Sequence, residues 1–127
     1  MVLTMRALTF AVCLVFAAAP AGLRAEITVT KSQDPVKVIR VSAERFAYTP
    51  SEIVVEKGTT IEFHLTSDDT DHGFRIVGTD VNAEIPKRRR GETIVKYVAD
   101  TAGTFVIECS RPCGAGHTSM RATLVVK

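Results

Sequence analysis

From Glu26 onward, apolar and polar side chains alternate in short segments that are separated by turns carrying Gly, Pro, Asp and Asn. A period of two is typical of β-strands that bury one face, and no segment shows the 3.6-residue period of a long amphipathic helix. The pattern predicts an all-β domain with little helix, an antiparallel β-sandwich or barrel. The expected strands are residues 27–30, 36–41, 51–56, 60–66, 72–77, 93–99, 103–109 and 121–126.

The first 25 residues have the organisation of a secretory signal peptide. Arg6 supplies a short basic region, residues 7–19 are apolar, and small residues follow at 19–21 and at Ala25. Because the apolar stretch is shorter than the roughly 20 residues of a membrane span, we favour cleavage over an uncleaved N-terminal anchor. We expect a signal peptide at 1–25, an N-terminal strand region at 26–43 and one domain at 44–127, located in the periplasm or otherwise outside the cytoplasm.

Cleavage changes the charge and the cysteine content. The full chain has 16 Lys+Arg and 14 Asp+Glu, a formal charge of +2, and the segment removed carries Arg6 and Arg24. The remainder is formally neutral and has no basic footprint for a nucleic acid. Cleavage also removes Cys13, so the mature domain keeps two cysteines, Cys109 and Cys113. Membrane association would then require an uncleaved N-terminus or a partner.

The loop from Cys109 to Met120 concentrates soft metal ligands. Its spacing is Cys-x3-Cys-x3-His-x2-Met, which brings Cys113 and His117 between the two end residues. The chain has three Cys, three His and three Met, and four of them lie in this loop. Thiolates, imidazoles and thioethers are the ligands that copper prefers.

The alternation of side chains along the strands adds His72 to the candidate metal ligands and excludes His64 from them. Side chains at alternate positions of a strand face the same side. Cys109, His72 and Met120 each stand at the end of an inward-facing apolar row, whereas His64 shares the polar face of its strand. The rows are Phe105-Ile107-Cys109, His72-Phe74-Ile76 and Met120-Ala122-Leu124-Val126, and His64 lies with Glu62 and Thr66.

Several kinds of site compete for these residues. A disulfide is the default for two cysteines in an oxidising compartment, but Cys109–Cys113 would close a very short loop and leave the nearby His and Met unexplained. Zinc gives the methionine no role, and a mononuclear blue-copper site needs one cysteine rather than two. Two thiols, two imidazoles and a thioether fit two copper ions that share both sulfurs.

These motifs resemble the copper A domains of cytochrome c oxidase subunit II and of nitrous oxide reductase. The resemblance covers about residues 44–127 and rests on five segments: Phe46-x3-Pro50, Lys57-Gly58, Ser67-Asp-Asp-Thr-Asp-His72-Gly-Phe, Gly103-Thr-Phe and Cys-x3-Cys-Gly-x2-His-x2-Met. It implies a cupredoxin-like Greek-key β-sandwich that holds a binuclear copper centre. In such a centre Cys109 and Cys113 would bridge the two ions, His72 and His117 would each bind one, and Met120 and the Arg111 carbonyl would be weak ligands.

The chain departs from the family pattern in places that concern electron transfer. Arg111 stands where an acidic or apolar residue is usual, so its charge should favour the reduced centre and alter docking. The chain has no Trp, the residue type through which electrons enter the oxidases. The acidic residues Asp68, Asp69 and Asp71 are either a face for a basic cytochrome or a solvated turn. Residues 87–90, Lys-Arg-Arg-Arg, are more often a solvated loop than a docking patch for an anionic partner or membrane.

The sequence favours an electron carrier over an enzyme, since it shows no Ser-His-Asp set, phosphate loop or paired carboxylates. We expect an exported, stand-alone electron-transfer protein with two copper ions, whose partner is a cytochrome or a terminal oxidase and which could act as an accessory or subunit-like component of a cytochrome c oxidase. The alternative is a periplasmic protein that binds and delivers copper for oxidase assembly. A disulfide-stapled structural sandwich is a third hypothesis.

Overall fold

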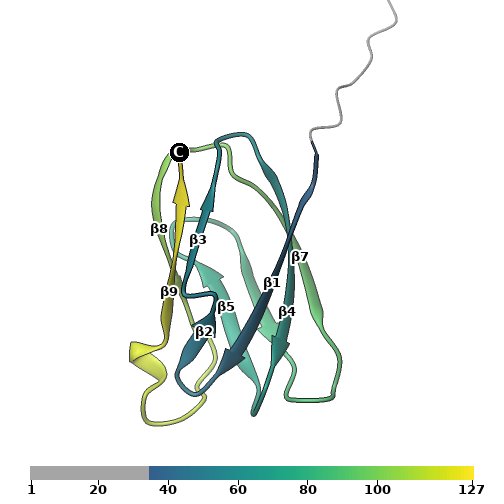
Figure 1. The fold of residues 1–127 in the computed structure, drawn as a ribbon. Helices are drawn as coiled ribbons and strands as arrows, with labels where there is room; N and C mark the ends of the chain where they lie inside the picture. Colours follow the sequence, from purple (N-terminus) through teal and green to yellow (C-terminus); the bar gives the residue numbers. More distant parts are fainter. Residues whose placement is uncertain (1–34) are drawn as a thin grey trace, which may run out of the picture. The chain divides into compact units, whose positions relative to one another are not determined.

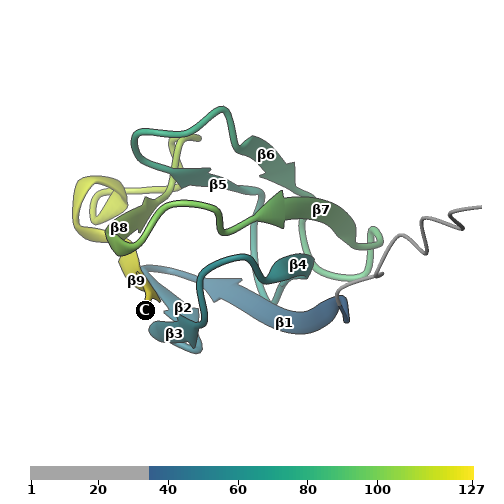
Figure 2. The ribbon, with the colours of Figure 1, turned by 90° about the horizontal axis from the view of Figure 1, so that it is seen from above.

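The computed structural model describes residues 35–127, which form a two-layer β-sandwich (Figure 1). One sheet has the strand order β2-β1-β4-β7 and the other β3-β9-β8-β5-β6, and the two layers are seen from above in Figure 2. The strands are β1 Lys37–Glu44, β2 Ala47–Thr49, β3 Glu52–Val55, β4 Thr60–Ser67, β5 His72–Ile76, β6 Asn82–Ile85, β7 Thr93–Val98, β8 Gly103–Glu108 and β9 Arg121–Val126. The predicted all-β sandwich is confirmed. The expected signal peptide and the strand at 27–30 lie outside the described residues.

The expectation of an antiparallel sandwich is wrong for two of the strand pairs. β1 runs parallel to β4, and β3 runs parallel to β9, while the other pairings are antiparallel. Alternation of side chains identifies a strand, but it carries no information on the direction of the neighbouring strand. β2 and β6 were also not predicted, because β2 has three residues and β6 buries only Ile85 fully.

The chain crosses between the sheets at Pro50. β2 pairs with β1 through Thr49 and Ser42, and three residues later β3 begins to pair with β9 through Glu52 and Thr123. Proline has no N–H to donate to a ladder, so it suits this change of sheet. β1 crosses the domain boundary expected between residues 43 and 44, a boundary that stays a prediction.

Inward-facing rows from both sheets fill the core. Ile61, Phe63 and Leu65 of β4 are fully buried, and the Phe63 ring lies 5.2 Å from the ring of Phe74 in β5. The rows predicted for β5, β8 and β9 do face inward. They end where β5 begins, β8 ends and β9 begins, and these three strand ends lie at the same end of the sandwich (Figure 1).

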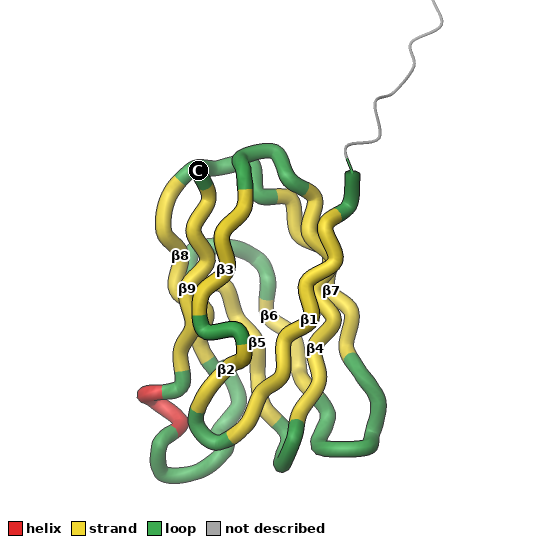
Figure 3. The backbone as a smooth tube through the Cα atoms, viewed as in Figure 1, coloured by secondary structure: helices red, strands yellow, loops and turns green. Residues whose placement is uncertain are grey.

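Helix is limited to one turn within residues 35–127. A 3-10 turn, η1, spans His117–Ser119 and is the red segment in Figure 3. The described part of the chain contains no helix with the length and apolarity of a membrane span. The prediction of little helix is confirmed for this part.

Candidate metal centre

Four soft donor side chains are buried together at the end of the sandwich where β5 begins. His72 and Met120 are fully buried, and Cys109 and Cys113 are each 5% exposed. One ring nitrogen of His72 and the two cysteine sulfurs lie within 4.8 Å of one another. Both cysteines are free thiols, so the disulfide alternative is not formed in this structure.

The remaining predicted residues surround the two sulfurs. The Cys109 and Cys113 Sγ atoms are 3.7 Å apart, and Cys113 Sγ lies 3.8 Å from His117 Nδ1 and 3.9 Å from Met120 Sδ. The backbone carbonyl of Arg111 lies 3.0 Å from Cys109 Sγ. His117 is half-buried, so of these side chains it is the imidazole closest to solvent.

A hydrogen bond to Asp69 orients the His72 ring. The distance from His72 Nε2 to Asp69 Oδ1 is 2.7 Å. Because an ionised carboxylate only accepts hydrogen bonds, Nε2 carries a proton, and in the neutral tautomer with this proton Nδ1 has the lone pair. Nδ1 is buried and has no hydrogen-bond partner among residues 35–127. The structure therefore presents a buried imidazole with one unsatisfied ring nitrogen next to two thiols.

Asp69 is itself held in place, a role that the sequence did not reveal. It accepts hydrogen bonds from the backbone N–H of Arg45 at 3.0 Å and from the Ser67 hydroxyl at 3.3 Å. Partial burial raises the pKa of Asp69, but the hydrogen bonds from His72 and from backbone N–H groups outweigh it, so the net pKa lies below its ordinary value. Asp69 is therefore ionised at neutral pH and remains an acceptor for His72.

Backbone groups also reach the sulfur of Cys109. The Gly73 N–H donates to Cys109 Sγ at 3.3 Å, and the Tyr48 hydroxyl donates to the Gly73 carbonyl at 2.5 Å. Burial, reinforced by the neighbouring Cys109, raises the pKa of the Tyr48 hydroxyl, which keeps it protonated as a donor. Burial and the second thiol likewise raise the pKa of Cys113 to about 11 in the metal-free protein. Outer hydrogen bonds of this kind fix a ligand's position and tune its metal.

The β1–β2 turn packs against the ligand loop. A Cβ atom built on Gly116 would overlap the Phe46 ring, and one on Gly114 would lie 3.0 Å from it. Arg45 Nε donates to the carbonyl of Cys113 at 2.7 Å. Glycine at these positions allows the loop to lie directly on the ring, and Gly114 adopts a φ of +140° that disfavours other residues.

The positive charge of the Arg111 side chain is paired with two carboxylates. Its guanidinium lies 2.9 Å from Glu84 and 3.7 Å from Asp71, while its carbonyl faces Cys109. We expected an added positive charge beside the centre, but this side chain is directed to two carboxylates on neighbouring elements. A sequence pattern cannot supply these contacts, because Glu84 and Asp71 come from different parts of the chain.

His64 lies outside the site, as parity predicted. It projects from the outer face of β4, where Nε2 lies 2.9 Å from Glu62 and Nδ1 lies 3.3 Å from Glu92. The hydrogen bond to Glu62 raises the pKa of His64 above its ordinary value, against partial desolvation and with help from Glu92. The same bond lowers the pKa of Glu62. His64 is therefore an ion-pairing residue of the sheet surface.

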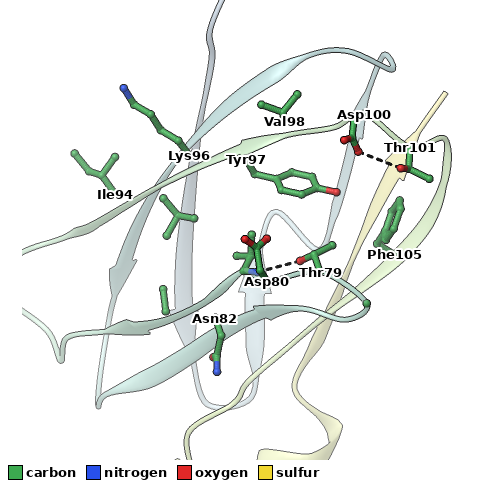
Figure 4. A pocket seen from close by; sticks show the side chains of 14 residues that line it. Thr79, Asp80, Asn82, Ile94, Lys96, Tyr97, Val98, Asp100, Thr101 and Phe105 are labelled. Carbon is green, nitrogen blue, oxygen red and sulfur yellow. Dashed lines mark hydrogen bonds between the residues drawn. The ribbon is translucent and has the colours of Figure 1, made fainter.

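A separate cleft lies between the edge strands β6 and β7 (Figure 4). Its lining includes Tyr97 and Phe105, with Asp80 and Asp100 from the turns at the opposite end from the metal site. Burial and these two carboxylates raise the pKa of Tyr97. The residues that line the cleft include no His or Cys, so it offers no second set of soft ligands.

The donor set fits copper. Two thiols, a thioether and two imidazoles, one with an orphaned buried nitrogen, are the ligands of a soft transition metal. Together with the mixed two-sheet sandwich, they define the class: a cupredoxin domain of the copper A type. The chain belongs to the family described as "Cytochrome C oxidase subunit II, periplasmic domain", whose model matches residues 26–127.

Relatives support this assignment. The chain is 40% identical over 90 residues to cytochrome c oxidase subunit 2 of Thermus thermophilus, a match covering 70% of this chain and 64% of the relative. For a second protein of the same name, from a particular strain of this species, the match covers 52% of the relative. The chain thus spans between half and two thirds of the length of these proteins.

Solved structures share the fold. The periplasmic domain of cytochrome oxidase subunit II from Bradyrhizobium japonicum superposes with a TM-score of 0.64 at 19% identity, covering 72% of this chain and 83% of that one. The blue copper protein auracyanin A from Chloroflexus aurantiacus superposes with a TM-score of 0.59 at 19% identity, covering 73% and 100%.

Substitution of Gly73 by alanine should disrupt the site through the backbone. The new Cβ would overlap Ser110 Oγ and would lie 2.5 Å from Ser110 N and 2.7 Å from Arg111 N. We expect Gly73→Ala to lower the free energy of unfolding by about 1–3 kcal/mol, measured by urea denaturation. Adding Ser110→Ala removes only the hydroxyl contact, so the double variant should stay destabilised. Full recovery in the double variant would contradict a backbone clash.

The Glu62–His64 pair should make stability depend on pH. A histidine pKa raised by folding stabilises the protein fully below the unfolded pKa of about 6.5, and this contribution is lost as pH rises through the folded value. NMR titration should give a pKa for His64 above about 6.5, the ordinary histidine value, and Glu62→Gln should lower it more than Glu92→Gln. The stability lost in Glu62→Gln should be greater at about pH 6 than at about pH 8.5. A normal His64 pKa in the wild-type chain would refute the pairing.

Proposed function

We propose that residues 44–127 form an exported electron-transfer domain with a binuclear copper A centre. Its ligands would be the side chains of His72, Cys109, Cys113, His117 and Met120 and the carbonyl of Arg111. The observation that carries the proposal is the buried His72 imidazole, which has one ring nitrogen within 4.8 Å of two free thiols that lie 3.7 Å apart and whose Nδ1 has no hydrogen-bond partner among the described residues. A mononuclear blue-copper site uses one cysteine, so it would leave the second thiol without a role.

Cys109 and Cys113, with the other proposed ligands, would hold the copper, and two copper ions bound there would supply one-electron chemistry. The protein's part is to keep the ligands in one arrangement in both redox states. Asp69 fixes the His72 ring, and the Gly73 N–H holds Cys109 Sγ. Phe46 and Arg45 hold the loop at Gly116 and Cys113. Burial of the thiols excludes water and limits reorganisation of solvent.

The place of action and the partner are part of the proposal. The family is that of a periplasmic domain, which supports a location outside the cytoplasm and agrees with a signal peptide at 1–25 followed by a strand region at 26–43. The matched relatives are cytochrome c oxidase subunits, which supports a cytochrome or a terminal oxidase as redox partner. Copper delivery to an oxidase uses the same ligands and differs in requiring a metal that exchanges.

Copper loading tests the proposal. The full chain, loaded with copper after its thiols have been reduced, should bind two copper ions, and the paramagnetic resonance spectrum of its mixed-valence form should show one unpaired electron coupled to two equivalent copper nuclei. His117→Gln should abolish this spectrum, whereas His64→Gln, a histidine outside the site, should leave it intact. One labile copper ion per chain would favour the delivery function. Failure of the reduced chain to bind copper would refute both functions.

Asp69 should be needed for tight binding although it is not a ligand. Loss of an outer carboxylate partner typically weakens metal binding by about 10- to 100-fold. We expect about tenfold weaker copper binding in Asp69→Asn, measured by competition with a chelator. Asp68→Asn is the matched control, because Asp68 accepts from Ser42 rather than from His72. Equal affinities in the two variants would show that the Asp69–His72 bond does not orient the ligand.

A further inference from the structure

The end of the sandwich that holds the metal site is the face a redox partner must approach. Four loops form this end: residues 45–46, 68–71, 86–92 and 109–120, which join β1 to β2, β4 to β5, β6 to β7 and β8 to β9 (Figure 1). His117 is half-buried there, while His72 is completely enclosed. Weak electron-transfer complexes bury up to about 1,200 Å² in total, so a partner over His117 also covers neighbouring loops.

The acidic residues of these loops are engaged inside the protein. Asp68 accepts from the Ser42 hydroxyl, and Asp69 accepts from His72. Asp71 accepts from the Lys87 N–H at 2.8 Å and lies near Arg111. These carboxylates are thus hydrogen-bonded within the domain, and the expectation that the acidic run faces a basic cytochrome stays a prediction.

The basic residues of the β6–β7 loop are, by contrast, available. We use the name basic rim for residues 87–90, Lys-Arg-Arg-Arg, all of which are exposed. None of these four side chains forms an ion pair with any other described residue. The backbone N–H of Arg88 donates to the Asp69 carbonyl at 3.2 Å, so the rim is attached to the loop that orients His72.

The loops at the opposite end of the sandwich contain no comparable cluster of basic residues. These loops, residues 56–59, 77–81 and 99–102, contain three acidic residues and one lysine: Glu56, Asp80, Asp100 and Lys57. The loops of the metal end contain six basic residues, Arg45, Lys87, Arg88, Arg89, Arg90 and Arg111, against the four acidic residues Asp68, Asp69, Asp71 and Glu92. The charge of Arg111 is offset by Glu84, whereas the four side chains of the basic rim have no ion-pair partner among the described residues and create a positive field beside the metal site. Such a field steers anionic molecules toward that end.

We propose that the basic rim docks an acidic protein redox partner over the metal end. This inference rests on the proposed electron-transfer function and specifies the charge of the partner. Complementary charges chiefly raise the association rate, and this gain falls as salt screens them. A solvated loop without a partner and attachment to an anionic membrane are the competing explanations of the same charges.

The test uses the full chain loaded with copper and reduced. One electron passes from it to an oxidised probe protein, either an acidic plant plastocyanin or a basic mitochondrial cytochrome c, and stopped-flow absorbance gives the second-order rate constant. We expect the plastocyanin rate constant to fall between about 10 and 200 mM salt, because the Debye length shortens several-fold over this range. At low salt, Arg88→Gln/Arg90→Gln should reduce it by about 3- to 10-fold.

The control removes the same charge from the other end of the domain. Lys57→Gln/Lys127→Gln deletes two exposed lysines that lie together there, with Lys57 N donating to Lys127 O at 2.7 Å. We expect this variant to stay within about twofold of the wild type. An equal loss in both variants, or no loss in either, would overturn the docking proposal. A cytochrome c rate constant that falls steeply with salt would also overturn it.

Two further measurements separate the alternatives. Binding to anionic phosphatidylglycerol vesicles that Arg88→Gln/Arg90→Gln abolishes, with an unchanged plastocyanin rate, would assign the rim to a membrane instead. Amide shift changes on addition of plastocyanin should centre on residues 86–92 and 110–119, and this readout needs no electron transfer. A chain that exchanges no electrons with small reagents such as ferricyanide would refute the proposed function, while the amide shifts would still decide whether the rim binds an acidic protein.

Discussion

The hydrogen bond between Asp69 and His72 is the interaction on which the metal site depends. It joins a loop to the first residue of β5, holds the imidazole in one orientation and leaves its buried Nδ1 without a partner among the described residues. A buried polar atom without a partner is costly unless something else satisfies it. Here the surroundings are two free thiols and a thioether, so a soft metal ion is the ligand that would relieve this cost. The groups that touch the site are in turn held by neighbours that do not touch it: Ser67, Arg45, Tyr48 and Phe46.

The carboxylates of the metal end differ from its basic rim in their contacts. Asp68, Asp69 and Asp71 accept hydrogen bonds within the protein, and Glu84 and Asp71 partner the Arg111 guanidinium. Acidic residues are thus used to build the site, whereas the arginines of the β6–β7 loop remain on the surface. Arg111 has two separate roles: its backbone carbonyl faces Cys109, and its side chain belongs to the network of surface charges.

Much of the fold and most of the site could be predicted from residues alone. Period-two alternation identified the long strands, and parity placed Cys109, His72 and Met120 at the ends of inward rows while excluding His64. The direction of β1 against β4, and of β3 against β9, could not be predicted, since alternation is the same in parallel and antiparallel strands. β2 and β6 are too short or too polar to show a pattern. The role of Asp69 and the packing of Phe46 on Gly116 depend on loop geometry, which brings together residues that no spacing rule connects.

The central claim is that the protein fixes His72 with its Nδ1 lone pair directed to the thiols before any metal binds. The most direct measurement is a long-range ¹H–¹⁵N correlation spectrum of the ¹⁵N-labelled full chain, metal-free and reduced, at neutral pH. The account predicts that His72 is a single neutral tautomer with its proton on Nε2 and an unprotonated Nδ1. A proton on Nδ1, or rapid exchange between the two tautomers, would contradict it.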